Sequence, residues 1–378
     1  MQAFVFTDKR LERYAGQFVW LQVDIENGAN AAFLAKYKIP AVPTLLVIDP
    51  KKESVALRYM SGATVQQLTK LLDDGKRAVK PEPPASADAL LTLADKYASD
   101  GLNDEAIAAY QQALAKAPKN WSRAGRASES YIGVLSLKKG EEQRCAQFAL
   151  DAYPRLKGTS SGANVAATGL GCAAELDAKT EKRDAMIAAL EAATRESMND
   201  PKIPLSGDDK SGMYQSLIAA REALKDEQGQ RKLTEEWSAF LDAEAAKAKT
   251  PEERVVYDSH RLGAYMALGT PEKAIPMLEQ SEKDFPNDYN APSRLSVAYK
   301  ALKKYDEALA ASERALKHVY GPRKITVLRN RADIYAAKGD KESAKKTLQE
   351  AIDYASSLPN GQRSEATIAA LKKKMDSM

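Results

Sequence analysis

Two cysteines are the residues of this sequence best suited to covalent chemistry. Cys145 and Cys172 have 26 residues between them, and the segments around them, 141–152 and 163–176, have the apolar spacing of helices. Because the intervening residues 154–162 contain proline and glycines, two antiparallel helices are expected, with both cysteines about equally far from the loop. One expectation is therefore a disulfide between them. The alternative is two buried, reduced thiols, since disulfides are rare in the cytosol.

The sequence indicates no other covalent or metal chemistry. Its two histidines, His260 and His318, lie far apart, and no Cys/His cluster has the spacing of zinc ligands. No glycine-rich loop follows a strand, as a phosphate site requires. No cysteine precedes Cys145, so the N-terminal part contains no Cys-x-x-Cys pair. We expect no metal, no cofactor and no dithiol–disulfide activity of the chain as given.

Composition and charge restrict the class of partner. The chain has 378 residues, of which 44% are hydrophobic and 29% charged, which suits two or more globular domains. The formal net charge is +4, and the excess of basic residues lies within residues 1–80. The balanced remainder predicts no broad phosphate-binding surface, so nucleic acid is not an expected partner. No apolar run approaches the roughly 18 residues of a membrane span, and residues 1–17 do not resemble a signal peptide.

The residue pattern divides the chain into two regions. Residues 1–76 mix strand-like and helix-like segments and predict an α/β region. Residues 77–86 contain three prolines in four positions, which favour an extended linker. Residues 87–378 are rich in alanine with a 3.6-residue apolar period, which predicts an all-α region.

The α/β region resembles the second half of a thioredoxin-like domain. The corresponding elements, in chain order, are an apolar strand ending in acid (18–24), a short helix (30–37), the turn Val42-Pro43-Thr44, two strands, Gly62 and a closing helix (64–72). In that family the proline is cis and lies against a Cys-x-x-Cys helix, which this chain lacks. The resemblance implies that residues 1–76 are an N-terminally truncated and redox-inactive domain.

The same resemblance implies a peptide platform. Thioredoxin-like domains use the backbone just before the cis-proline to pair with an extended peptide, which assigns this role to Val42, Pro43 and Thr44. The alternative is that Pro43 only sets the shape of the loop. A full-length form with the missing helix would be a thiol–disulfide oxidoreductase or chaperone, expected in the periplasm or secreted. A natural redox-inactive form is the other hypothesis.

The helical region repeats itself. Tyr265 and Tyr299 are 34 residues apart, as are Ala274 and Ala308, and Tyr335 and Ala344 follow after 36 in each case. Small residues such as these alanines let paired helices approach closely. This pattern resembles the tetratricopeptide repeat, whose helical hairpins stack into a solenoid. Four units match this pattern well, at roughly 87–120, 255–288, 289–322 and 325–358. Residues 121–250 match it less well. A C-terminal helix is expected to cap the last hairpin.

The resemblance to these repeats also implies a binding surface. In that family the first helix of each hairpin lines a concave groove that binds peptides or protein segments. Asn290, Lys300, Arg329 and Asp333 are expected to point into it, although a solvated surface is the alternative. The sequence thus favours a scaffold that binds protein or peptide clients.

Overall fold

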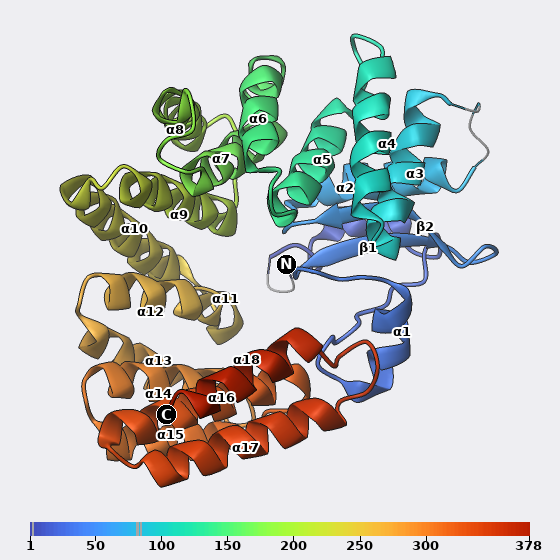
Figure 1. Ribbon diagram of the computed structural model, residues 1–378. Coiled ribbons are helices and arrows are strands. Elements are labelled where there is room, and N and C mark those ends of the chain that lie inside the picture. The colour runs from blue at the N-terminus through green and yellow to red at the C-terminus, as the bar shows by residue number, and fades with distance from the viewer. Residues whose placement is uncertain (2–3, 81–82, 84) are drawn as a thin grey trace. The chain divides into compact units, whose positions relative to one another are not determined.

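The computed structural model describes residues 1, 4–80, 83 and 85–378 (Figure 1). The chain divides into two compact units. Unit 1 comprises Met1–Phe18 and Tyr37–Trp237, and unit 2 comprises Val19–Lys36 and Ser238–Met378. The chain therefore passes between the units after Phe18, Lys36 and Trp237.

Unit 1 begins with a small α/β part. Its elements are the 3₁₀ helix η1 (Lys9–Tyr14), strands β1 (Thr44–Asp49) and β2 (Ser54–Met60), and helix α2 (Val65–Ala78). The strands form one antiparallel pair with Thr44 opposite Met60. A capping box of Thr64 and Gln67 starts α2 by satisfying its first backbone donors. The Tyr14 hydroxyl donates to the Thr69 carbonyl at 2.8 Å, which attaches η1 to α2.

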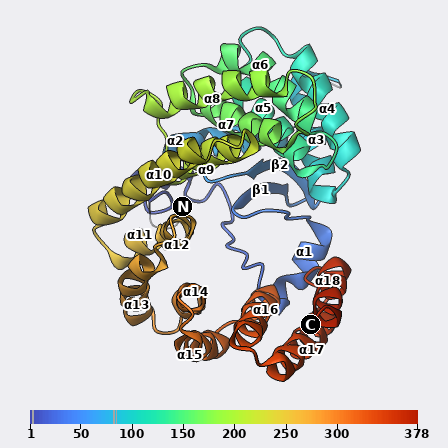
Figure 2. The same ribbon diagram turned by 60° about the vertical axis from the view of Figure 1, so that its left-hand side comes forward.

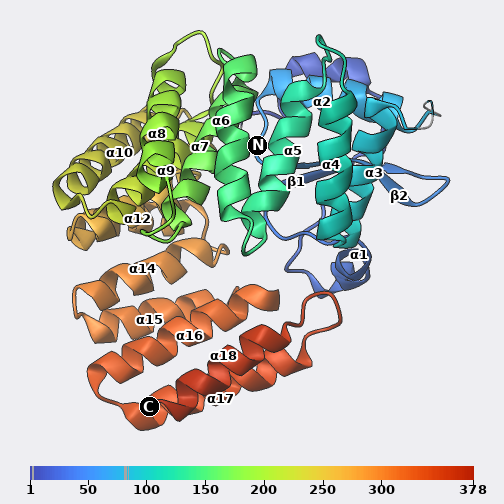
Figure 3. The same cartoon turned by 45° about the horizontal axis from the view of Figure 1, so that its top comes forward.

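Eight helices follow in chain order: α3 (Ala87–Asp100), α4 (Asn103–Lys116), α5 (Ala124–Leu137), α6 (Glu142–Leu156), α7 (Ser160–Glu175), α8 (Arg183–Asn199), α9 (Gly207–Ala223) and α10 (Glu227–Lys247). Helix α3 packs on α4, and α6 packs on α7 (Figure 3). One continuous apolar core runs from Leu91 to Leu233. Strand β2 packs against α3 and α5, so the α/β part and the first helices share a unit. The expected linker at 77–86 falls inside unit 1, and its residues 81, 82 and 84 lie outside the described residues.

Unit 2 contains the segment 19–36, with η2 (Gly28–Asn30) and α1 (Ala31–Lys36), and a series of C-terminal helices. These are α11 (Pro251–Val255), α12 (Asp258–Ala267), η3 (Pro271–Lys273), α13 (Ala274–Asp284), α14 (Asn290–Ala301), α15 (Tyr305–Leu316), α16 (Gly321–Lys338), α17 (Lys341–Ser357) and α18 (Glu365–Asp376). Figure 2 shows α14 to α17 following one another around unit 2. The alanines expected at the contacts between paired helices, Ala274, Ala308 and Ala344, are fully buried.

The α/β part differs from the sequence-based expectation in two places. Residues 18–24, all of them described, form no strand, and Val19 and Leu21 are 88% and 76% exposed. A strand needs a neighbour for its backbone hydrogen bonds, and the described sheet contains only β1 and β2. The short helix expected at 30–37 forms as α1, but it belongs to unit 2. The fold is therefore mostly a helical solenoid with a small two-stranded sheet.

Candidate binding site

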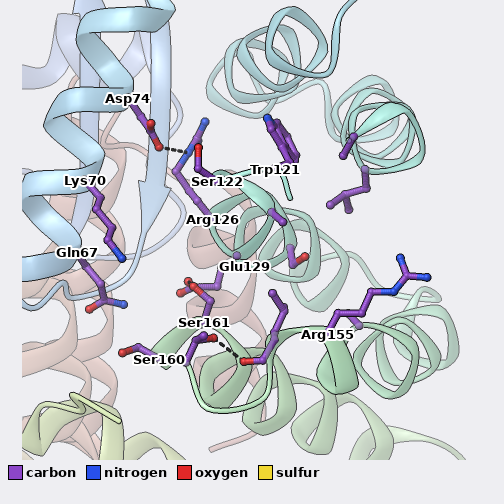
Figure 4. A pocket seen from close by; sticks show the side chains of 18 of the residues that line it. Gln67, Lys70, Asp74, Trp121, Ser122, Arg126, Glu129, Arg155, Ser160 and Ser161 are labelled. Carbon is purple, nitrogen blue, oxygen red and sulfur yellow. Dashed lines mark hydrogen bonds and ion pairs between the residues drawn. The ribbon is translucent and has the colours of Figure 1, made fainter. Parts of the chain in front are cut away.

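A pocket of about 1130 Å³ lies in unit 1 (Figure 4). It is lined by α2, the loop between α4 and α5, helices α5 and α6, and the start of α7. In Figure 4 Gln67 and Lys70 extend from α2 on one side, while Arg155 lies on the other. Trp121 and Phe148 contribute apolar surface to the same lining.

Paired charges hold one wall of the pocket. Asp74 accepts a hydrogen bond from Arg77 at 2.6 Å and one from Arg123 at 3.3 Å. Arg126 donates to the fully buried Asp95 at 2.7 Å. Burial is the largest influence on the pKa of Arg126 and lowers it, but the charge and hydrogen bond of Asp95, together with Asp74 and Tyr110, outweigh burial, so that the pKa is raised. Arg123 and Arg126 are engaged by carboxylates of α2 and α3, so they help to position α5.

The Asp95 carboxylate has a second donor. The Tyr110 hydroxyl donates to it at 2.6 Å, and both side chains are completely buried. Burial is the main reason that the pKa of Tyr110 is raised well above its usual range, and the neighbouring carboxylate adds to the effect. The network thus links α3, α4 and α5 through two hydrogen bonds to one carboxylate, while the buried Arg126 Nε has no hydrogen-bond partner among the described residues.

Glu129 of α5 places a carboxylate at the pocket. It accepts hydrogen bonds from Tyr59 at 2.8 Å, from Asn164 at 3.0 Å and from Ser161. Burial raises the pKa of Glu129, and the three donors oppose this rise. Because its donors come from β2 and α7, Glu129 is a fixed acceptor that joins these elements to α5.

The rim of the pocket carries cations without acidic partners. Lys70, Lys119 and Arg155 are exposed, and within the described residues they form no ion pair. Asp74 and Glu129 are already engaged, which leaves Asp151 as the exposed acid of the lining. The half-buried Trp121 lies in the same lining, with its indole N–H donated to Asp88 at 2.8 Å. The rim thus combines excess positive charge with apolar surface.

The residues of the expected peptide platform lie outside this pocket. The Val42–Pro43 peptide bond is cis, and Val42 is 54% exposed. The Thr44 hydroxyl donates to the Ala41 carbonyl at 2.7 Å, at the start of β1. Among the described strands β1 pairs only with β2. Binding of a peptide beside Val42 stays a prediction.

The four residues expected in the repeat groove have separate surroundings. Asn290 donates to Asp288 at 2.8 Å, and Lys300 donates to Asn330 at 2.9 Å. Asp333 forms an ion pair of 2.6 Å with Lys374 of the capping helix α18, and Arg329 is exposed. In the described chain no hydrogen bond joins any two of the four. Their role in peptide binding stays a prediction.

The two cysteines lie on adjacent helices. The structure joins Cys145 of α6 to Cys172 of α7, with Cα atoms 6.0 Å apart, and both side chains are buried. This Cα separation lies within the range that a disulfide spans. The oxidation state in solution stays a prediction.

The pocket residues were missed by the sequence analysis, although one signal was present. The segment that forms α5 places Arg126, Ser128 and Glu129 among small and apolar residues. Charged residues on a helix that is expected to be buried need polar partners. Such residues are therefore candidates for a polar site. Across the described residues no group of His, Cys, Asp or Glu could hold a metal ion. No described helix is long and apolar enough to cross a membrane.

Comparison with known proteins identifies repeats at both ends of the helical region. Models of the tetratricopeptide repeat match residues 66–120 and 289–357. The first match begins in α2, the helix expected to close the α/β region, and the second covers α14 to α17. No curated protein matches the sequence.

Two solved structures are similar at low identity. One is the complex of the TPR2AB domain of yeast Sti1 with pHSP90, with 20% identity, a TM-score of 0.29, and coverage of 77% of this chain and 98% of that one. The other is the APC/C hetero-tetramer Cut9-Hcn1, with 14% identity, a TM-score of 0.35, and coverage of 82% and 59%. The two family matches show that this chain contains tetratricopeptide repeats.

Proposed function

We propose that the protein is a scaffold that binds a segment of a partner protein in the pocket of unit 1. This proposal rests on the combination of about 1130 Å³ of space with apolar side chains and with cations that form no ion pair in the described part of the chain. Pockets of this kind bury apolar groups of a ligand while a few polar groups fix its orientation. Tetratricopeptide repeats in the same unit agree with a binding role.

The charges of the lining predict the chemistry of the partner. Inside the wall the charges of Asp74 and Asp95 are balanced by Arg123 and Arg126, whereas Lys70 and Arg155 form no ion pair with any described residue. Carboxylates of a ligand would form charge-assisted hydrogen bonds with these two cations. Glu129 would repel an acidic side chain placed near it. We therefore expect a segment with an apolar side chain near Trp121 and acidic residues toward the rim.

A peptide selection with matched charge variants tests the proposal. Twelve-residue peptides of random sequence are selected on the full chain, and affinities are measured by fluorescence anisotropy. We expect enrichment of acidic peptides with an aromatic or aliphatic residue, and at least tenfold weaker binding by the variant K70E/R155E. The control K345E/K346E changes the charge equally at exposed sites of α17 and should bind within twofold of the parent chain.

Two results would contradict this function. The first is selection of peptides with no excess of acidic residues. The second is an equal loss of affinity in K345E/K346E, which would show that net charge rather than the pocket determines binding.

The thioredoxin-like character of residues 1–76 is a finer part of this proposal. The order β1, β2, α2 agrees with the two strands and closing helix of that resemblance, and neither family match includes residues 1–65. We expect this region to be redox-inactive in the chain as given, because no cysteine precedes Cys145. The alternative is a full-length thiol–disulfide oxidoreductase that acts on clients held by the repeats. Insulin reduction that is abolished by C145S or C172S would contradict inactivity of this chain.

A further inference from the structure

Residues 19–36 pack with the C-terminal helices of unit 2, although the chain on both sides of them belongs to unit 1. The centre of this segment is Asp24-Ile25-Glu26. The Glu26 carboxylate accepts hydrogen bonds from the Tyr289 hydroxyl at 2.9 Å and from Arg323 Nε at 2.9 Å. The segment is thereby held by side chains more than 260 positions away in the sequence.

The two residues that precede Glu26 are held as well. Asp24 accepts a hydrogen bond from the Tyr320 hydroxyl at 2.6 Å, and Gln362 donates to the Ile25 carbonyl at 2.8 Å. Within the segment, the Glu26 backbone N–H donates to the Asp24 carboxylate at 2.9 Å. This local turn holds the two acidic side chains where both can contact the helices.

The recognising side chains match the charge of the segment. The Glu26 side chain is only 14% exposed, and its ion pair with Arg323 compensates for its loss of water. Burial, reinforced by Glu26, raises the pKa of Tyr289, and the hydrogen bond to Asp24 raises the pKa of Tyr320. Both hydroxyls therefore remain neutral donors at neutral pH. Tyr289 and Tyr320 directly precede α14 and α16, where the helix dipole also favours carboxylates.

Two glycines let the segment approach closely. A Cβ atom on Gly321 would lie 2.0 Å from the Glu26 carbonyl oxygen, and one on Gly361 would lie 2.4 Å from the Ala31 carbonyl oxygen. Figures 1 and 3 both show the loop between α17 and α18 next to α1. Since no other residue would leave this space, the surface is shaped for backbone contact as well as for carboxylates.

The buried apolar residues of the segment lie in α1 rather than at its start. Ala31 and Leu34 of α1 are buried, whereas Val19 and Leu21 at the start of the segment are largely exposed. Hydrogen bonds to water compete with the polar contacts that hold Asp24 and Glu26, so the net free energy of each contact is modest. A second segment with the same carboxylates would meet the same donors.

We propose that Tyr289, Tyr320, Arg323 and Gln362 form a receptor for an extended Asp-x-Glu segment. The chain's own Asp24-Ile25-Glu26 occupies this receptor, and a partner protein with the same acidic spacing competes for it. The receptor shares no residue with the pocket of unit 1. Failure of the receptor proposal would therefore leave the proposed function of the pocket unaffected, and the reverse also holds.

A binding experiment on the full chain tests the receptor. A fluorescent peptide with the sequence of residues 19–36 is added to the parent chain and to D24A/E26A, in which the resident carboxylates are removed. The parent's own segment has a high effective concentration and excludes the peptide. We expect at least tenfold tighter peptide binding to D24A/E26A than to the parent, and loss of that binding when Y289F and R323A are added. Equal affinity of parent and D24A/E26A, or binding unaffected by Y289F/R323A, would overturn the proposal.

A glycine pair provides an independent measurement of the same contact. G321A introduces a Cβ atom against Glu26 at a position with φ of +57°. G339A introduces one at another positive φ, +91°, where no atom lies within 4 Å. Hydrogen exchange of residues 24–36 is expected to increase at least tenfold in G321A and to remain unchanged in G339A. Equal exchange in the two variants would show that close backbone docking does not hold the segment.

Discussion

The helices of unit 1 and those of unit 2 build their cores differently. In unit 1 one large apolar core extends from Leu91 to Leu233, beside a smaller cluster of the α/β part and α2. In unit 2 the core consists of separate clusters, including one from Leu262 to Ala311 and one from Ile325 to Leu371. Regular repeats contact chiefly their neighbours, so their cores remain local. Where the repeat pattern weakens, helices contact several others and the core becomes continuous.

Two ion pairs between neighbouring helices, one from each unit, also differ. In unit 1 Asp95 and Arg126 form a buried ion pair, which also engages Tyr110. In unit 2 the pair of Lys338 and Asp306 joins neighbouring hairpins with both side chains exposed. A buried pair tolerates few alternative arrangements of its helices, so it can specify packing where the repeat pattern does not. Four experiments sharpen this comparison.

The largest effect is expected from breaking the buried pair of unit 1. D95A leaves Arg126 as a buried charge without its partner and the Tyr110 hydroxyl without its acceptor. Removing one member of such a pair costs about 3–5 kcal/mol of unfolding free energy. Urea unfolding followed by the fluorescence of Trp121 and Trp237 measures this loss. D306A in unit 2 is the control, and its urea midpoint should be unchanged because its ion pair is exposed.

Similar urea midpoints for D95A and D306A would contradict the comparison. They would mean that the buried network of unit 1 contributes no more to stability than an exposed ion pair.

The next effect is expected from the cysteines, which lie in unit 1. Closing the loop between Cys145 and Cys172 with a disulfide stabilises a fold by about 3–4 kcal/mol in the chain-entropy model. Protein made in an oxidising compartment is alkylated before reduction and examined by mass spectrometry. We expect no alkylated cysteine, and a loss of stability on reduction that is absent in C145A/C172A. Two alkylated cysteines would support the alternative of reduced thiols.

The repeats of unit 2 were the most predictable part of the fold. The 34-residue spacing of Tyr265 and Tyr299 is a local signal, because each hairpin buries its alanines against its own partner helix. Ala274, Ala308 and Ala344 are fully buried as this spacing predicts. A pattern that recurs along the chain needs no knowledge of distant contacts.

The incorrectly predicted and missed features depend on distant contacts. The segment 18–24 has the composition of a strand, but a strand forms only where another strand is available to pair with it. Glu26 meets Tyr289 across 263 positions, and no periodicity indicates such a pair. The pocket residues Lys70 and Glu129 come from elements that the family match and the repeat spacing do not relate to each other. Sequence pattern thus predicts local hairpins better than the sites that hairpins assemble.

A third experiment compares the two kinds of core directly. Leu170 and Leu348 are both fully buried, the first in the continuous core of unit 1 and the second in a local cluster of unit 2. Replacement of either by alanine is expected to cost about 3 kcal/mol, a usual value for buried leucine. Hydrogen exchange should increase throughout α5 to α9 in L170A but only within α16 to α18 in L348A. Increased exchange of equal extent in both variants would contradict the difference in core structure.

The smallest effect is expected from the titration of Glu129 at the pocket of unit 1. Burial raises its pKa above the ordinary value of 4.5, so the folded protein holds this proton more tightly than the unfolded chain. The stabilising contribution is present below about pH 4.5 and is lost as the pH rises through the raised pKa. E129Q does not titrate, so the parent should lose stability relative to E129Q as the pH rises above the ordinary value of 4.5 and through the raised pKa. Urea midpoints at several pH values measure the difference, with E105Q at an exposed site of α4 as the control. A difference between parent and E129Q that is independent of pH would show that burial does not hold the Glu129 proton, and Glu129 would then resemble an exposed acid.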